Sequence, residues 1–457
     1  MIRENLTRSE RKIFPLGLMF LFLLLTLFFS CDNKQGTEKP YDPSKPVTVS
    51  SFFPDSGGMA SKVIIQGSNF GNSAEEVKVY FNQKQAAVIS SKGDIMYVLV
   101  PRQPGDVCKV SVVVGKDSVV FDQTFRYKTS VVVTTVASKP NSLGDDDYIY
   151  DGTLAEVAYG WIDYLVVDKE NNLFINQSWP PRIIFINEEQ NRSTVAYGPH
   201  PVTWWQSFSQ PTIDSEGSVV YFPDEGNDWN GPNRENFYVL DPGTQWAASV
   251  RQMIHPSEAD QAAGVKDFYV TNKDAFAYNP ADGSIWTRSR ESGQMIRFHA
   301  KTRKGEAIEN GIMPGSEGKM TFHPTEKNIL YIAYTNRNCI FTYNVETHEH
   351  KLFAGKQGVQ GWRDGARLEA EFNHPEQITF DADGNLYVAD ANNHAIRKIA
   401  TDGLVSTVIG IGGTSGYQDG SPEEALLNTP SGIAVNKDGD IYIGDNGNKC
   451  IRKLSIQ

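Results

Sequence analysis

One unit of sequence occurs twice near the C-terminal end of the chain. The segment Trp362–Gly365 returns as Tyr417–Gly420, and the segment Asp383–Asp390 returns as Asp438–Asp445, always at the same spacing. Each copy consists of short β-branched and aromatic runs separated by Asp-Gly turns, and a fixed period of about 55 residues with this content is typical of propeller blades. The repeat therefore constrains most of the chain to a ring of small β-sheets.

Weaker copies of the unit precede the two strong ones. A strand, a tight turn, a second strand and then a third strand can be traced from Tyr164, from Pro211, from Phe276 and from Met320. The segment 129–457 has the length of six such units. We therefore expect an all-β fold in which a six-bladed propeller occupies residues 129–457.

The ring should be closed by a strand from the other end of the propeller sequence. The last unit stops after its third strand, at Ile456, whereas the segment 131–137 looks like the missing outer strand. Pairing between 131–137 and the C-terminal sheet would cover an exposed edge that otherwise invites aggregation.

Residues 47–128 contain a second module of short strands between Gly, Pro, Asn and Asp clusters. About 80 residues with this pattern predict an immunoglobulin-like sandwich. The turns Phe53–Gly58 and Gly67–Gly71 and the Val-Pro pair at Val100 resemble those of the IPT/TIG family. The resemblance implies that the glycines of these turns are structural.

The strong repeats resemble the NHL family, whose signature combines an Asp-Gly loop, a Pro before the innermost strand, Asp-Gly-Asn-Leu-Tyr-Val-Ala-Asp and Ile-Arg-Lys. The resemblance implies that Asp390 and Asp445 tie down their own loops by accepting backbone N–H bonds. We expect Arg397 and Arg452 to be charges on the blade surface. The family includes enzymes, ligand binders and interaction modules, so it does not determine a function.

Residues 1–30 predict an export signal. Basic residues precede an apolar run, Ile13–Phe29, which ends at Ser30 and Cys31. The pattern resembles bacterial lipoprotein signals and implies lipidation of Cys31, with a short transmembrane anchor as the alternative. Residues 31–46 are polar and contain three prolines, as expected for a tether. We therefore expect an exported protein that is lipid-anchored to the outer membrane at the cell surface.

Charge and cysteine content restrict the possible partners. The net charge of −12 argues against nucleic acid, because binding to its backbone needs clustered Lys and Arg. Cys108, Cys339 and Cys450 are an odd number and cannot form a complete disulfide framework. We expect them to be small buried packing residues.

Tryptophans gather in the loops of the first three predicted units. In a propeller, the loop between the second and third strands and the loop that leads to the next blade emerge on one face. Indole rings stack on the C–H faces of sugars, while carboxylates, amides and guanidinium groups pair with sugar hydroxyls. The candidate ligand-binding residues on this face are Trp179, Arg182, His200, Trp204, Trp205, Asp224, Asp228, Trp229 and Arg234.

Anchor, sandwich and propeller in this order resemble the accessory glycan-binding lipoproteins of glycan-foraging Gram-negative bacteria. The sequence therefore favours a noncatalytic protein that binds an oligosaccharide or polysaccharide. The resemblance implies that it works beside an outer-membrane glycan transporter complex.

Two other functions remain as alternatives. A metal-dependent propeller hydrolase or lyase, lactonase-like, would gather acids or histidines around the channel. The residues expected near the channel mouth are Asp163, Gln210, Glu376 and Gln377, which is a sparse set. No catalytic residue, metal ligand or cofactor is assigned, although a channel Ca²⁺ is left open. The second alternative is a protein-interaction scaffold.

Overall fold

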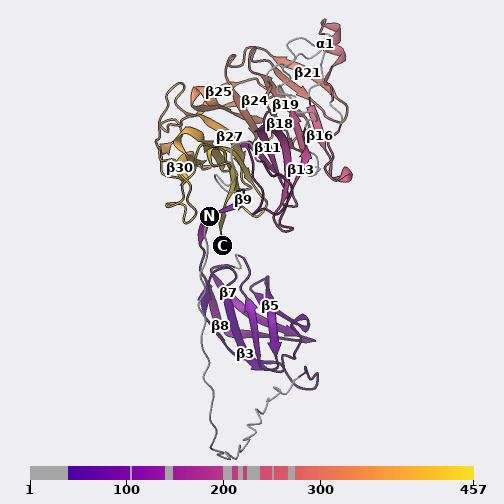
Figure 1. Ribbon diagram of the computed structural model, residues 1–457, viewed down its shortest axis with the longest axis vertical. Coiled ribbons are helices and arrows are strands. Elements are labelled where there is room, and N and C mark those ends of the chain that lie inside the picture. Colours follow the sequence, from indigo (N-terminus) through magenta and orange to yellow (C-terminus); the bar gives the residue numbers. More distant parts are fainter. Residues whose placement is uncertain are drawn as a thin grey trace, which may run out of the picture.

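The computed structural model describes residues 40–102, 105–138, 148–198, 208–214, 220–223, 237–249, 252–265 and 273–456. These residues form a β-sandwich followed by a ring of sheets (Figure 1). The prediction of an all-β fold with these two modules is confirmed. In the described parts of the chain, no helix is both long enough and apolar enough to cross a bilayer.

The sandwich contains eight strands in the order β1-β3-β6-β5-β4-β7-β8-β2. These are β1 (Thr48–Phe53), β2 (Ser56–Gly57), β3 (Lys62–Ser68), β4 (Val77–Phe81), β5 (Lys84–Lys92), β6 (Ile95–Leu99), β7 (Val107–Val114) and β8 (Asp117–Tyr127), with the 3₁₀ turn η1 (Ala74–Glu76) before β4. β5 pairs with β6 on one side and with β4 on the other, so it continues from one face of the sandwich into the other.

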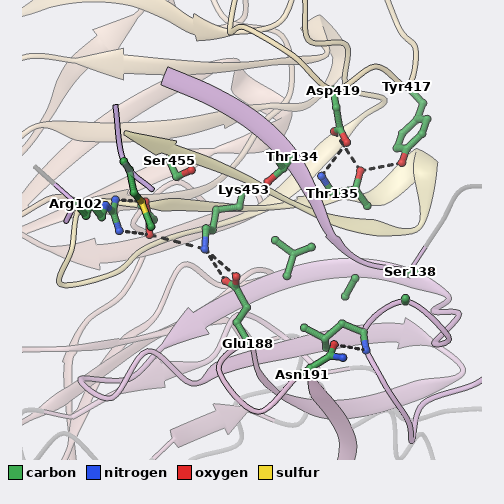
Figure 2. A pocket seen from close by; sticks show the side chains of 16 residues that line it. Arg102, Thr134, Thr135, Ser138, Glu188, Asn191, Tyr417, Asp419, Lys453 and Ser455 are labelled. Carbon is green, nitrogen blue, oxygen red and sulfur yellow. Dashed lines mark hydrogen bonds and ion pairs between the residues drawn. The ribbon is translucent and has the colours of Figure 1, made fainter. Parts of the chain in front are cut away.

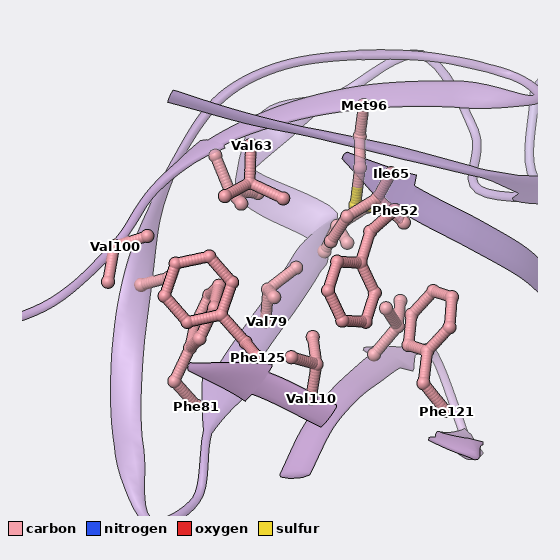
Figure 3. Packing of buried hydrophobic residues seen from close by; sticks show 14 of the residues in the cluster. Phe52, Val63, Ile65, Val79, Phe81, Met96, Val100, Val110, Phe121 and Phe125 are labelled. Carbon is pink, nitrogen blue, oxygen red and sulfur yellow. The ribbon is translucent and has the colours of Figure 1, made fainter. Parts of the chain in front are cut away.

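The core of the sandwich is built from alternate residues of these strands. In β7, every second side chain from Cys108 to Val114 is fully buried, as the twofold alternation of side chains along a strand requires. Figure 3 shows the aromatic part of this core. Phe52 packs edge to face against Phe121, and Phe81 packs edge to face against Phe125, with ring centroids 5.0 Å apart in each pair. Edge-to-face packing adds to the burial of these rings.

Six sheets form the ring. The first contains β10 (Trp161–Val167), β11 (Leu173–Trp179), β12 (Pro181–Asn187) and β13 (Arg192–Tyr197). The second contains β14 (Thr212–Ile213), β15 (Val220–Pro223) and β16 (Phe237–Leu240), followed by η2 (Pro242–Thr244). The third contains β18 (Lys273–Tyr278), β19 (Ile285–Ser289), β20 (Met295–Phe298) and β21 (Lys304–Glu309), with β17 (His255–Pro256) and α1 (Glu258–Ala262) before it.

The remaining three sheets follow the same order, from an innermost to an outer strand. The fourth contains β22 (Gly318–Phe322), β23 (Ile329–Tyr334), η3 (Thr335–Arg337), β24 (Cys339–Asn344) and β25 (His350–Gly355). The fifth contains β27 (Pro375–Phe380), β28 (Leu386–Asp390), η4 (Ala391–Asn393), β29 (Ala395–Ile399) and β30 (Leu404–Ile409), and the short β26 (Gly365–Ala366) pairs with the outer strand β30. The sixth contains β31 (Pro430–Val435), β32 (Ile441–Asp445), η5 (Asn446–Asn448), β33 (Cys450–Ile456) and β9 (Val131–Ala137). In the described residues, the ring thus consists of six sheets.

Strand β9 closes the ring as the sequence predicts. It pairs antiparallel with β33, and Val133 lies opposite Leu454. On its other side Val133 exchanges two backbone hydrogen bonds with Gly420, of 2.8 and 3.0 Å. Val133 is therefore fully buried between the C-terminal strand and the preceding loop. The N-terminal strand and the C-terminal sheet are held together by a continuous ladder.

The repeated aspartates have the role that the NHL resemblance implies. Asp390 Oδ1 accepts the backbone N–H of Asn373 at 2.7 Å, and Asp390 Oδ2 accepts the side-chain amide of Asn393 at 2.8 Å. Asp445 repeats both bonds with Asn428 and Asn448, at 2.7 and 2.8 Å. Each carboxylate therefore organises the loop that enters and the loop that leaves its own sheet.

The prediction that Arg397 and Arg452 are surface charges is wrong. Both side chains are 0 % exposed. Arg397 Nη1 lies 2.8 Å from Asp390 Oδ2, and Arg397 Nη2 lies 2.5 Å from Oδ1 of Asp364, the aspartate of the Asp-Gly loop. The loop folds back over the sheet and covers the guanidinium group. Its carboxylate comes from 33 residues earlier in the chain, so local sequence does not reveal the pairing.

The three cysteines after residue 40 are buried free thiols, as expected.

The sandwich and the ring touch through Arg102, in the loop between β6 and β7. Its Nη1 donates to Asp440 Oδ2 at 2.9 Å, and its Nε donates to the Ile456 carbonyl at 3.0 Å. Asp440 lies in the turn before β32, so this arginine links the sandwich to the sheet that closes the ring.

Candidate functional site

The innermost strands of the six sheets begin at the same end of the central channel. We call this end the channel mouth and define it by Asp163, Tyr164, Asp274, Lys319 and Glu376, each near the start of its innermost strand. The connections between second and third strands lie at this end too. In the sixth sheet, for example, Asn446 of η5 donates to Asp163 at 3.2 Å.

The tryptophan-bearing segments leave the described sheets at this same end. The segment 224–236 connects β15 to β16, whose residues Pro223 and Phe237 face each other across the ladder. The segment 199–207 connects the first sheet to Phe208, whose carbonyl accepts the side-chain amide of Asn176 near the end of β11. The insertions of the first and second sheets therefore begin and end at the edge that carries the channel mouth.

Most of the predicted ligand-binding residues lie outside the described residues. These are His200, Trp204, Trp205, Asp224, Asp228, Trp229 and Arg234, and Cys31 lies outside them as well. Trp179 ends β11 and is paired across the ladder with Trp161. The Arg182 guanidinium lies 5.7 Å from the Tyr150 ring and donates to the Pro181 carbonyl at 2.7 Å.

A chain of four polar side chains spans the channel mouth. Lys319 Nζ donates to the Tyr164 hydroxyl at 2.6 Å and lies 3.7 Å from Glu376 Oε2. The other carboxylate oxygen of Glu376 lies 3.1 Å from His374 Nδ1. The Lys319 side chain is 4 % exposed and that of His374 is 43 % exposed, so the chain runs from the buried channel wall to the surface. It joins the first, fourth and fifth sheets.

The charges of this chain stabilise one another. Burial opposes the ionisation of Glu376, but Lys319 and His374 outweigh it, and the pKa of Glu376 lies below its usual value. Burial likewise opposes the charge on Lys319, yet its negative neighbours raise the pKa of Lys319 well above the ordinary range. Burial raises the pKa of the Tyr164 hydroxyl. The hydrogen bond with Glu376 raises the pKa of His374. Lysine and glutamate therefore stay charged over a wide pH range.

A second group of charges lies between the third and fourth sheets. Asp274 is 0 % exposed and lies 3.3 Å from Arg288 and 3.0 Å from Arg290. Arg290 also lies 2.9 Å from Glu317, just before β22. The sequence analysis did not predict this group, although the two arginines at positions 288 and 290, at the end of β19, were a visible signal. The mouth therefore carries more charged side chains than the four residues expected there from the sequence would supply.

Gln210 and Gln377, two of the residues expected near the channel mouth, are buried in the channel wall. Gln377 Oε1 accepts the Leu165 N–H at 2.8 Å, and its Nε2 donates to the Leu165 carbonyl at 2.6 Å. Gln210 makes the same pair of bonds with Met320, at 3.0 and 2.7 Å. Each amide imitates a backbone ladder and ties innermost strands across an intervening sheet. These two side chains are therefore buried braces of the ring.

The channel contains a cavity of about 260 Å³ that is lined by the two glutamines and mainly by innermost-strand residues of several sheets. Among the residues that the structure describes, no group of three or more His, Cys, Asp or Glu side chains is arranged to hold a metal ion.

Family models match two parts of the chain. The IPT/TIG domain matches residues 46–127, and the NHL repeat matches residues 372–399 and 427–454. NHL repeat-containing protein 2 of Homo sapiens is 31% identical over 198 residues, which are 38% of this chain and 27% of that protein. The chain spans about a quarter or less of the curated relatives that it matches first.

Solved structures match over nearly the whole chain. An auxiliary nutrient binding protein from Bacteroides thetaiotaomicron VPI-5482 is 25% identical, with a TM-score of 0.60 and coverage of 91% of this chain and 99% of that chain. Another from Bacteroides ovatus ATCC 8483 is 23% identical, with a TM-score of 0.66 and coverage of 92% and 100%, which shows a shared fold. The protein thus carries an IPT/TIG domain followed by NHL repeats in a propeller-like ring of sheets.

Proposed function

We propose that the protein is a surface-anchored, noncatalytic binding protein that captures oligosaccharides at the channel-mouth face. The observation that carries this proposal is a coincidence of two features at one edge of the ring. The segments 199–207 and 224–236, which hold three tryptophans, begin and end at the edge of the ring that carries the channel mouth, where the His374 side chain is 43 % exposed. Aromatic surface and fixed polar groups on one face suit a sugar.

The electrostatics of Lys319 and Glu376 suit binding. A general acid or base works best when its pKa lies near the working pH. The pKa of Glu376 is lowered and that of Lys319 is raised, so neither exchanges a proton readily near neutrality. Their hydrogen-bonding atoms are held in constant charge states beside the exposed His374, which suits the recognition of neutral hydroxyl groups.

The likeness to solved proteins supports the same class of function. The structure from Bacteroides thetaiotaomicron is described as an auxiliary nutrient binding protein, and it aligns with both domains of this chain. We propose that the nutrient is a glycan, that Cys31 carries the lipid anchor, and that a neighbouring glycan transporter receives the ligand. The sandwich would then hold the propeller away from the outer membrane.

A glycan array tests the proposal. The full chain, solubilised in a sugar-free detergent, is expected to bind at least one oligosaccharide class. Replacing Trp204, Trp205 or Trp229 with alanine should weaken this binding about fivefold, since stacking of one aromatic ring contributes about 1 kcal/mol. Trp362→Ala is the matched control, because this exposed tryptophan lies between β25 and β26, outside the segments 199–207 and 224–236. Absence of binding to every glycan, or equal binding by all variants, would refute the proposal.

A further inference from the structure

A second cavity lies between the sandwich and the ring, away from the channel mouth. It has a volume of about 630 Å³ and is shown in Figure 2. Arg102 contributes one wall from the sandwich, while Lys453 contributes from the closing sheet. Glu188 and Asn191 contribute from the turn between β12 and β13 of the first sheet. The volume lies in the range of small-molecule sites.

The charges around this cavity are already paired. Lys453 Nζ lies 2.9 and 2.8 Å from the two carboxylate oxygens of Glu188. Arg102 is bound to Asp440 through two of its nitrogens. Asp419 also lines the cavity, and its charge is neutralised by Arg452, whose Nη2 lies 2.7 Å from Asp419 Oδ1. The lining therefore has no unmatched charge for an anion or a cation, and it favours a neutral polar ligand.

The paired groups still have hydrogen-bonding capacity toward the cavity. Carboxylate oxygens accept more than one hydrogen bond, so Glu188 and Asp440 can also accept hydroxyl groups. Asn191 Oδ1 accepts the Leu154 N–H at 3.2 Å, which fixes the amide and leaves its two N–H donors without a protein partner among the described residues. The Thr134 hydroxyl faces the same space (Figure 2).

Apolar groups complete the lining. Met59 of the sandwich, which is 46 % exposed, and Leu154 of the ring both border the cavity. A ligand that places hydroxyl groups against carboxylates and amides, and C–H groups against a thioether and an aliphatic side chain, is a sugar or a similar polyol.

We propose that this cavity is a second ligand site, for a neutral monosaccharide or disaccharide, formed by the two domains together. The site is separate from the channel mouth and does not depend on the function proposed there. Arg102 is its positioning residue, because the bonds to Asp440 and to the Ile456 carbonyl hold the sandwich wall against the ring. Ligand binding in the cavity is therefore coupled to the orientation of the two domains, since a ligand that touches both walls strengthens the contact between the sandwich and the ring.

Two variants address different parts of the site. Asn191→Asp keeps the oxygen that accepts the Leu154 N–H but removes the amide donors. Asn191 has a φ of 50°, a left-handed conformation that aspartate also tolerates. Arg102→Ala removes the link between the domains. Arg126→Ala is the matched control, because it changes an arginine of the same sandwich that is 70 % exposed.

The experiment is titration calorimetry of the full chain in a sugar-free detergent with glucose, galactose, mannose, N-acetylglucosamine, maltose and lactose. At least one of these sugars is expected to bind. Asn191→Asp and Arg102→Ala should each weaken its affinity at least tenfold, whereas Arg126→Ala should leave it unchanged. The double variant Trp204→Ala/Trp205→Ala should keep the part of the binding that depends on Asn191 and Arg102.

Three results would overturn the proposal. The first is that none of the six sugars binds. The second is binding that is insensitive to both Asn191→Asp and Arg102→Ala. The third is loss of binding in the Trp204→Ala/Trp205→Ala variant alone, which would assign the sugar to the channel mouth and support the proposed function instead.

Discussion

Replacement of Arg452 by methionine is expected to destabilise the propeller by about 3–5 kcal/mol, the cost of breaking a buried ion pair by removing one partner. The Arg452 side chain is 0 % exposed and lies 2.9 Å from Asp445 and 2.7 Å from Asp419. It also donates to the carbonyl groups of Leu426 and Gln418, at 3.0 and 2.6 Å. Methionine fills a similar volume but satisfies none of these acceptors.

The magnitude depends on the carboxylate that remains. Burial raises the pKa of Asp445 to about 6, while hydrogen bonds from Asn448 and Asn428 and the charge of Arg452 limit the rise. Loss of Arg452 raises this pKa further. Because the folded-state pKa lies above the unfolded value, the penalty is largest above the folded-state pKa and is lost as the pH falls toward the unfolded value near 4. The destabilisation should therefore be smaller at pH 5 than at pH 7.5.

A matched double variant separates the charge from the packing. Asp445→Asn combined with Arg452→Met removes both charges, while the asparagine oxygen still accepts the Asn428 N–H. Replacing a whole buried pair is much less costly than breaking it, so the double variant is expected to lose no more than about 2 kcal/mol. Arg397→Met repeats the single change in the fifth sheet.

Urea unfolding followed by tryptophan fluorescence measures these effects. All eight tryptophans lie between positions 161 and 362, so the signal reports the propeller and not the sandwich. Comparison of each variant with the wild type at the same pH gives the change in free energy of unfolding. A loss below about 1 kcal/mol for Arg452→Met, or a double variant as unstable as the single one, would contradict a buried and uncompensated Asp445.

Two further predictions concern acid stability and anchoring. Burial and the nearby Arg288 lower the pKa of His350 to about 4, so the folded chain keeps this imidazole neutral while the unfolded chain protonates near 6.5. Stability from this site is complete above pH 6.5 and is lost toward pH 4, on the order of 1 kcal/mol after allowance for partial exposure. His350→Gln should therefore lose less stability than wild type between pH 7 and pH 4.5 in the same urea assay, and an equal loss would exclude the effect. Cys31→Ser should move the protein from the membrane fraction to the soluble fraction of a Gram-negative host, and persistent sedimentation with membranes would argue against a lipid anchor.

The repeat made most of the fold predictable. The constant spacing of the two copies and the Asp-Gly turns are features of the local sequence, and they predicted the strands of the fifth and sixth sheets. The likeness of 131–137 to the missing outer strand also predicted the strand that closes the ring, because a strand without a partner must find a free edge. The role of Asp390 and Asp445 was implied by the resemblance to NHL repeats.

The site was much less predictable, because its contacts join sheets that are distant in the sequence. Lys319 and Tyr164 are 155 residues apart, and only closure of the ring brings them within 2.6 Å. The burial of Arg397 depends on how a preceding loop folds over the sheet. Seven of the nine predicted ligand-binding residues lie outside the described residues, so their role stays a prediction.

The sequence by itself determined the number and type of modules, because hydrophobic period, turn residues and repeat length act over a few residues at a time. Only the tertiary structure decided which charges are buried, which glutamines brace the channel and how Arg102 meets Asp440 across the domains. Those contacts depend on distances between separate sheets. A charged residue has the same letter at the surface and in a covered pocket, and the carboxylate that makes its burial stable is contributed by another part of the chain.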